Sequence, residues 1–245
     1  MLELKTLPTD CAKRRNSNAC DTCGARALSV CGSVAEGDLG RLDAMAEHLT
    51  FAAGAVMIRE GDPAGHVFNI TSGSVRVYKL LADGRRQIIG FLFTGDFLGL
   101  ATPDTYVFSA EAVEPASVCR FRKTEYRALI RDCPALEATL FDRANHELAA
   151  AQNQMLLLGR KTALERIATF LLDLPSHDPA RTIPPGHVHL PMTRAEIADY
   201  LGLTIETVSR VLTRLKTQGV IRLVSLSELR VEQPEVLRDL ADGVG

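Results

Sequence analysis

The sequence predicts an α+β protein with an N-terminal β-roll, one long helix and a C-terminal domain of helices with a small β-wing. Three observations lead to this prediction. Short apolar stretches punctuated by glycine fill residues 51–122, which is typical of antiparallel strands joined by tight turns. A helical repeat of apolar residues follows Cys133. Two helix-capping patterns nearer the C-terminus then indicate a pair of shorter helices.

Bulk properties limit the possible partners. The chain has 245 residues, six cysteines and a formal net charge of -2, so it is not a generally basic nucleic-acid binder. Between Arg160 and Arg230, however, ten Lys or Arg stand against seven Asp or Glu, a local net charge of +3. No apolar run approaches the ~18 residues of a membrane span, and no apolar export signal is present. We therefore expect a cytoplasmic protein without a membrane partner, whose cysteines are metal ligands or free thiols rather than disulfides.

The first two predicted parts are an irregular, cysteine-bearing segment at residues 1–34 and the β-roll at residues 35–132. Within the roll, Asp83-Gly84 lies between the apolar stretches SVRVYKLLA and RRQIIGFLF. This pair predicts a β-hairpin with a type I′ turn, because that turn needs positive φ at both central residues.

The third predicted part is a helix at residues 133–159 with an apolar seam. The seam residues recur at spacings of three and four: Leu136, Leu140, Ala144, Leu148, Ala151, Met155 and Leu158. Such a helix can pack on its own roll, or it can pair with a second copy. The stretch from Leu148 to Gly159 is uncharged and favours pairing, since a lone helix would expose it. We expect a homodimer whose seam includes Leu148, Ala151, Met155 and Leu158.

The fourth predicted part is a winged helix-turn-helix domain at residues 160–245. Thr162 and Glu165 form a capping box that restarts the helix after residue 160. A second box at Thr193-Arg194-Ala195-Glu196 begins a short helix, and Gly202 makes the turn to the next one. Further signals are a helix cap at Thr204, a helix end at Gly219, and a β-wing at Ile221–Val224 and Leu229–Val231.

The second helix of this pair has the side chains that read DNA bases. Glu206, Ser209 and Arg210 share its outer face, and an arginine can donate two hydrogen bonds to guanine. The predicted phosphate contacts are Thr193, Arg194, Thr204 and Thr207. An ordinary helical hairpin with a solvated polar face would show a similar pattern.

Cysteines supply the second candidate site. Cys20, Cys23 and Cys31 lie close together in the sequence, and Cys119 is a distant fourth ligand. Four thiolates suit zinc or an iron–sulfur cluster, and the residues alone leave both open. Cys11 is a possible substitute for one of the four, whereas Cys133 is interpreted as a packed apolar residue.

Other polar residues receive no role. His187 and His189 alternate on a predicted strand, which surface polarity explains better than metal ligation. The sequence contains no phosphate-binding loop and no paired histidine and nucleophile, so we expect no enzymatic activity.

These residues together give the chain a family resemblance. The cysteine set, the glycine-punctuated roll, LLLGRKTALERIATFL and MTRAEIADYLGLTIETVSRVLTRL resemble the CRP/FNR superfamily of bacterial regulators, and within it the FNR-type oxygen sensors. The resemblance implies a roll of the cyclic-nucleotide-binding jelly-roll type. It also implies a [4Fe-4S] cluster on Cys20, Cys23, Cys31 and Cys119 that is lost in oxygen. The expected partners are a palindromic promoter site of the TTGAT-N4-ATCAA kind and RNA polymerase. Cys23 and Cys31 are farther apart than in the best-known members, which affects the geometry of their loop.

Three alternatives accompany this interpretation. A cyclic nucleotide is not expected, because Gly95-Asp96 stands where a phosphate-binding member has its anchor and no Lys or Arg occurs between Arg86 and Arg120. A zinc- or thiol-based redox regulator could use the same scaffold. An iron–sulfur electron carrier would explain the cysteines but not the helix pair.

Overall fold

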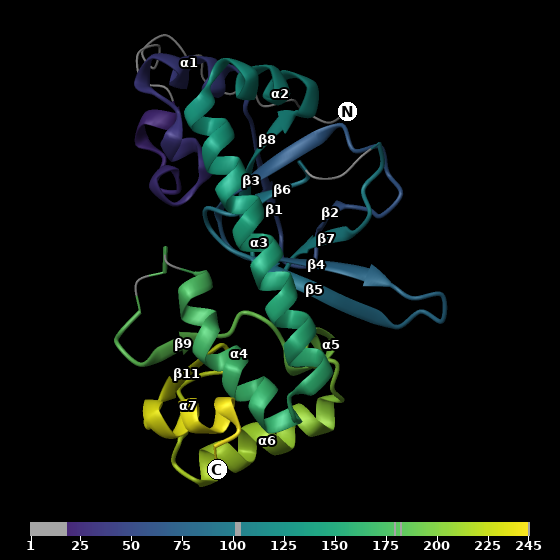
Figure 1. The fold of residues 1–245 in the computed structure, drawn as a ribbon, viewed down its shortest axis with the longest axis vertical. Helices are drawn as coiled ribbons and strands as arrows, with labels where there is room; N and C mark the ends of the chain where they lie inside the picture. Colours follow the sequence, from purple (N-terminus) through teal and green to yellow (C-terminus); the bar gives the residue numbers. More distant parts are fainter. Residues whose placement is uncertain (1–18, 101–103, 179, 182, 245) are drawn as a thin grey trace, which may run out of the picture.

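The computed structural model describes residues 19–100, 104–178, 180–181 and 183–244. Cys11 and the other residues up to 18 lie outside the described residues. A long helix connects the β-roll with the C-terminal domain (Figure 1). This arrangement confirms the predicted α+β architecture. In the described part of the chain, no helix has the length and apolarity needed to cross a membrane.

The roll consists of two four-stranded antiparallel sheets with the orders β1-β8-β3-β6 and β2-β7-β4-β5. Its strands are β1 (Glu47–Phe51), β2 (Val56–Ile58), β3 (His66–Ser72), β4 (Val75–Leu80), β5 (Arg86–Leu92), β6 (Phe97–Leu98), β7 (Ser109–Ala112) and β8 (Ala116–Arg122). Inward-facing side chains such as Ile70, Val75 and Val118 are almost completely buried between the sheets. The period-2 alternation of apolar residues therefore produces a closed core.

The β4–β5 hairpin corrects the predicted turn type. The hairpin itself is confirmed, since Leu80 pairs with Arg86 at its end. Gly84 has a φ of 84°, but among the described residues only glycines have positive φ, so Asp83 does not adopt the type I′ conformation. Five residues separate the strands, and the amide of Gly84 donates to the Leu81 carbonyl at 2.9 Å. The Asp83 carboxylate accepts from the Arg85 amide at 3.0 Å, and this local bond stabilises the longer loop.

Three helices and the N-terminal segment form a second core at one end of the roll. The segment contains three short 3-10 helices, which are η1 (Ala19–Thr22), η2 (Arg26–Leu28) and η3 (Val30–Ser33). The helices are α1 (Glu36–Met45), α2 (Lys123–Asp132) and the first half of α3 (Pro134–Arg160). The purple segment lies beside that half of α3 in Figure 1. We call this second core the cysteine core; its buried members are Cys20, Val30, Cys31, Val34, Leu39, Leu42, Val67, Cys119, Phe121, Tyr126, Leu129, Cys133 and Leu136.

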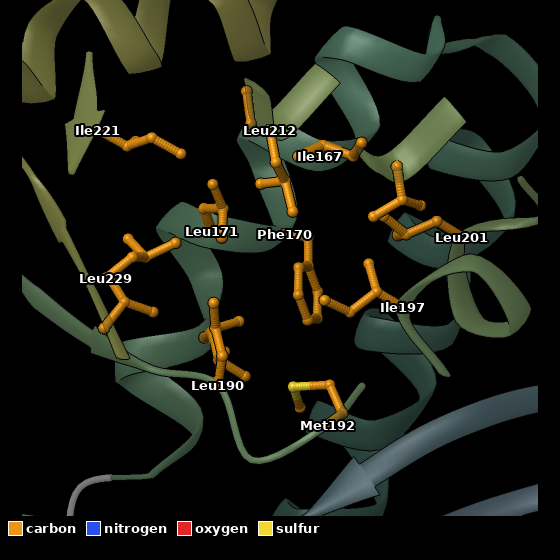
Figure 2. Close-up of a cluster of buried hydrophobic side chains, with 14 of the residues drawn as sticks. Ile167, Phe170, Leu171, Leu190, Met192, Ile197, Leu201, Leu212, Ile221 and Leu229 are labelled. Carbon is orange, nitrogen blue, oxygen red and sulfur yellow. The ribbon is translucent and has the colours of Figure 1, made fainter. Parts of the chain in front are cut away.

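The C-terminal domain follows the second half of α3. Its elements are α4 (Ala163–His177), β9 (His187–His189), α5 (Arg194–Leu201), α6 (Ile205–Thr217), β10 (Ile221–Leu223), β11 (Glu228–Val231) and α7 (Pro234–Asp242). Strands β10, β11 and β9 form a three-stranded sheet, so the predicted wing has one additional strand. Ile167, Phe170 and Leu171 of α4 point into the centre of the core, where side chains from the helix pair and the sheet meet them (Figure 2).

The roll is docked on this domain through β4 and β5. Arg76 of β4 forms ion pairs with Glu111 of β7 and with Glu196 of α5. Phe91 of β5 packs edge-to-face on Tyr200 of α5, with ring centroids 5.3 Å apart. The buried cluster of the C-terminal domain continues into the roll through these aromatic contacts.

Candidate DNA-binding surface and cysteine site

The helix pair α5 and α6 begins at side-chain caps that the sequence predicts. Thr193 Oγ1 accepts from the Glu196 amide at 3.3 Å, and Glu196 Oε2 accepts from the Thr193 amide at 2.6 Å. Gly202, with a φ of 63°, makes the turn. Thr204 Oγ1 then caps α6 by accepting from the Thr207 amide at 3.2 Å. These bonds satisfy helix N-terminal amides and fix the start of each helix.

The outer face of α6 presents the predicted base-reading side chains. Val208, Leu212 and Leu215 point inward and are at most 4% exposed. Glu206 and Arg210 are exposed on the other face, and Ser209 is half-buried between them. Hydrogen bonds from its own backbone and from Thr204 hold the pKa of Glu206 below its usual value, so this side chain is an ionised acceptor. The surface therefore offers a donor fork and an acceptor side by side.

The four predicted phosphate contacts lie around the starts of α5 and α6. Thr193 Oγ1 also donates to Glu196 Oε2 at 2.7 Å, so its hydroxyl proton is already used within the capping box. Arg194 is exposed and has no ion pair among the described residues. Thr207 Oγ1 accepts from Arg210 Nη2 at 3.3 Å, so a predicted phosphate contact is hydrogen-bonded to a predicted base-reading residue. Arg194 is thus the cation of this set that is best placed for a phosphate.

The cysteine core brings together the other predicted site residues. Cys20 and Cys31 come from the 3-10 helices of the N-terminal segment, and Cys119 comes from β8, a central strand of its sheet. These three side chains are 6% to 8% exposed, while Cys23 is half-buried. All four are free thiols. The N-terminal segment and strand β8 therefore supply thiols to the same apolar core.

Burial controls the acidity of these thiols. The pKa of Cys20 and of Cys119 is raised to about 12 each, first by burial and also by other cysteines of the set. The pKa of Cys31 is also raised, first by burial, although a hydrogen bond from Ser29 acts in the opposite direction. Without a cation these thiols stay protonated at neutral pH, whereas a metal ion would favour their thiolates.

The donor set suits a soft metal centre, but its side chains do not form a ligating arrangement here. The described residues contain no group of three or more His, Cys, Asp or Glu that could hold a metal ion as they stand. The residue types, their mutual proximity and their apolar surroundings nevertheless fit thiolate ligation. Assignment of a cluster to these four residues stays a prediction.

Several neighbours of the thiols were not predicted from the sequence. Asp43 of α1 lies beside Cys20 and raises its pKa. His48 is paired with Cys119 across β1 and β8, with Nδ1 3.5 Å from Sγ. Tyr126 of α2 is completely buried in the same core. Helices α1 and α2, which carry Asp43 and Tyr126, were not predicted, and His48 reaches Cys119 only through the pairing of β1 with β8. Cys133 is 6% exposed and packs in the cysteine core, as an apolar residue would.

The predicted seam of α3 divides into three zones. Leu136 is completely buried and Leu140 packs against the cysteine core, while Leu158 packs against the C-terminal core. Between them Leu148 and Met155 are 60% and 66% exposed. The other exposed seam members are Ala144 and Ala151.

Two large exposed apolar residues of α3, Phe141 and Leu156, were not predicted for the seam. Phe141 is 67% exposed, seven residues before Leu148 and fourteen before Met155. The unpartnered face thus keeps a seven-residue repeat, with Phe141 in the place given to Leu140.

Comparison with known families identifies both halves of the fold. Residues 48–133 match the cyclic nucleotide-binding domain, and residues 165–240 match the Crp-like helix-turn-helix domain. Similar proteins include the transcriptional activatory protein AadR of Rhodopseudomonas palustris, 40% identical over 91% of this chain and 93% of the relative. The nitrogen fixation regulation protein FixK of Bradyrhizobium diazoefficiens is 39% identical over 85% of this chain and 88% of its own. The transcriptional activator protein anr of Pseudomonas aeruginosa is 37% identical, covering 82% and 84%.

A solved structure agrees with these matches. FixK2 from Bradyrhizobium japonicum superimposes with a TM-score of 0.74 at 37% identity, over 80% of this chain and 96% of that chain. A roll joined by one helix to a capped helix pair with a wing defines a DNA-binding transcription regulator. The chain belongs to the CRP/FNR family of such regulators, among relatives of the FixK and FNR types.

Proposed function

We propose that this regulator responds to oxygen through a [4Fe-4S] cluster on Cys20, Cys23, Cys31 and Cys119, and binds a palindromic promoter site as a homodimer. The observation that carries the proposal is the joint burial of thiols from the N-terminal segment and from β8 beside α3. When bound, such a cluster supplies an oxidisable centre that binds the segment to the roll.

Contacts between the N-terminal segment and α3 would make the position of α3 depend on whether the segment is held in place. Arg143 of α3 donates to the carbonyl oxygen of Leu28, which lies between Cys23 and Cys31. The same guanidinium is 3.7 Å from the Asp96 carboxylate at the turn before β6. The backbone at Gly95 lies close to Leu28, and only glycine allows this, since a Cβ at residue 95 would be 2.7 Å from the Leu28 carbonyl oxygen. Holding this loop in place therefore favours one position of the dimer helix.

Pairing of α3 would bury the exposed repeat of Phe141, Leu148 and Met155. It would also place two α6 helices on one duplex, one helical turn apart. Two half-sites then bind with avidity, so a modest change in dimerisation changes promoter occupancy strongly. RNA polymerase is the expected partner of the DNA-bound dimer.

A cyclic nucleotide is not part of the proposal, although the family model of the roll carries that name. A cavity of about 720 Å³ between the roll and α3 is lined by Asp96, Glu147 and Arg143, among others. Arg143 was not predicted as a cation of this cavity, but its guanidinium already faces Asp96. Two carboxylates beside this cation disfavour a phosphate.

An anaerobic preparation tests the proposal. We expect broad absorption near roughly 400 nm, dimer mass in size-exclusion chromatography and a DNA gel shift, all lost after exposure to air. Serine in place of Cys20, Cys23, Cys31 or Cys119 should remove iron, whereas Cys133→Ser in the same core should keep it. A colourless, iron-free protein that binds DNA equally in air and without it would refute the proposal. Bound zinc in that preparation would favour the zinc-based alternative.

The thiol-only and electron-carrier alternatives are less well supported. A thiol sensor needs a reactive thiolate, but burial raises the pKa of Cys20 and Cys119 to about 12. An electron carrier has no use for the exposed face of α6. Retention of the visible absorption without any DNA shift would favour the carrier.

A further inference from the structure

Tyr126 carries a buried hydroxyl group without a hydrogen-bond partner in the described part of the chain. Its side chain is completely buried, on α2, within the cysteine core. A buried polar group that makes no hydrogen bond costs about 1 to 3 kcal/mol relative to a satisfied one. Most buried hydroxyls in proteins have a partner, so this exception calls for a ligand or another explanation.

The ring of Tyr126 is held in one orientation by aromatic neighbours. Phe97 of β6 stacks on it with ring centroids 5.2 Å apart, and Phe121 of β8 packs at the same centroid distance with a tilt of 47°. These contacts fix the position of the hydroxyl oxygen, which can change only the direction of its proton. The apolar packing would be equally good for phenylalanine, so the hydroxyl has no packing role.

The ionisable groups that act on this hydroxyl are cysteines. Burial raises the pKa of Tyr126, and Cys31 and Cys133 raise it further. The hydroxyl carries one proton that it can donate, and no acceptor takes it among the described residues. Sulfur ligands of a cluster are acceptors that such a donor can serve, and hydrogen bonds to sulfur adjust the reduction potential.

We propose that Tyr126 donates a hydrogen bond to the sulfur of Cys31 when the iron–sulfur cluster is bound, and thereby slows its loss in oxygen. This inference rests on the proposed function. A donor withdraws electron density from the sulfur and stabilises the more reduced state, so it raises the potential. Tyr126 is thus a positioning and tuning residue of the site rather than a ligand.

Tyr126→Phe separates the hydroxyl from the ring. In the anaerobically purified variant we expect the full iron content and a lower reduction potential. We also expect the visible absorption to decay in air about three- to tenfold faster than in the parent protein. In the metal-free protein the same variant should be as stable as the parent or more stable, because it removes an unsatisfied buried group.

Tyr106→Phe is the matched control. Tyr106 is also buried, but its hydroxyl donates to the His66 carbonyl at 2.8 Å and accepts from the His66 amide at 3.2 Å. This variant should lower the melting temperature of the metal-free protein and leave the potential and the decay rate unchanged.

Three results are decisive. A parent protein without a cluster would overturn the proposed function and this inference together. A parent with a cluster, combined with unchanged potential and decay in Tyr126→Phe, would overturn the inference alone. Loss of metal-free stability in Tyr126→Phe equal to that in Tyr106→Phe would also overturn it, since the hydroxyl would then have a structural partner.

Discussion

Arg210 and Arg194 are both exposed cations of the helix pair, but they occupy different places. Arg210 is on the outer face of α6, within one turn of Glu206, and Arg194 is the first residue of α5. A guanidinium on the outer face can read guanine, whereas one at the rim contacts phosphates of any sequence. Of these two arginines, only Arg210 should contribute to base reading.

Alanine substitutions test this division. Arg210→Ala should weaken binding to the palindrome by about 1 to 3 kcal/mol and relax the preference at one base position. Arg194→Ala should weaken all DNA sequences alike and reduce the salt dependence of binding. Gel shifts on the palindrome and on single-base variants measure both effects. Equal losses on every sequence for both variants would contradict the assignment.

Asp96 gives a pH dependence of stability. Its pKa is raised to about 6, first by burial and also by Glu147 of α3, while the Phe93 amide, Arg143 and His177 act in the opposite direction. Between pH 4 and 6 the folded protein keeps a proton that the unfolded chain releases, so the free energy of unfolding falls as pH rises through this window.

Asp96→Asn removes this dependence and keeps an acceptor for the Phe93 amide, which the carboxylate now binds at 2.8 Å. At pH 7 the metal-free variant should be more stable than the parent by up to about 3 kcal/mol, and near pH 4 the difference should vanish. Urea unfolding of both proteins across this pH range measures it. A difference that does not change with pH would show that Asp96 does not titrate in this window.

At the scale of elements, local sequence patterns correctly predicted the helix starts that depend only on residues close in sequence. The capping boxes at Thr162 and Thr193 are confirmed, because each satisfies amides within its own first turn. Helices α1, α2 and α7 were missed, and the last two show the reason. Both pack their apolar face on elements distant in sequence, α2 on β3 and β8 and α7 on α4. Helices this short are stabilised by such tertiary contacts, which their own sequence does not reveal.

Helix α3 shows the limit of a periodic pattern. Its spacing of three and four predicted one continuous seam, but the ends of the seam pack within the chain and only the middle is exposed. Phe141 replaced Leu140 on the exposed face because the repeat of seven residues, rather than apolarity, decides which side chains share it. The pattern could predict the helix and an exposed apolar face but not where each core begins.

Leu148→Glu tests the interface of α3. Leu148 is at the centre of the exposed repeat, and an uncompensated charge there would cost several kcal/mol in a paired state. We expect the anaerobic protein to change from dimer to monomer mass and to lose the DNA shift. Ala149→Glu, on the exposed flank of the same helix, is the control and should stay dimeric. A dimeric Leu148→Glu variant would place the interface elsewhere.

At the scale of the whole molecule, the docking of the roll on the C-terminal domain could not be predicted from sequence. Arg76 and Glu196 are 120 residues apart in the sequence. The local pattern around Arg76 predicts only a strand, and the one around Glu196 predicts only a capping box. Their pairing depends on the direction of α3, which sets where β4 meets α5. Glu196 thus serves the start of α5 and the domain contact at once.

Arg76→Ala should destabilise the protein more than removal of an exposed ion pair. Arg76 is 14% exposed and Glu196 is 6% exposed, so the variant leaves the Glu111 and Glu196 carboxylates buried without their shared cation. The expected loss in the free energy of unfolding is about 3 to 5 kcal/mol. Arg85→Ala, which removes a 77% exposed partner of Asp83, should change it by less than about 1 kcal/mol. Urea unfolding followed by circular dichroism compares the two. Equal stabilities would mean that Phe91 and Tyr200, rather than the ion pairs, hold the domains together.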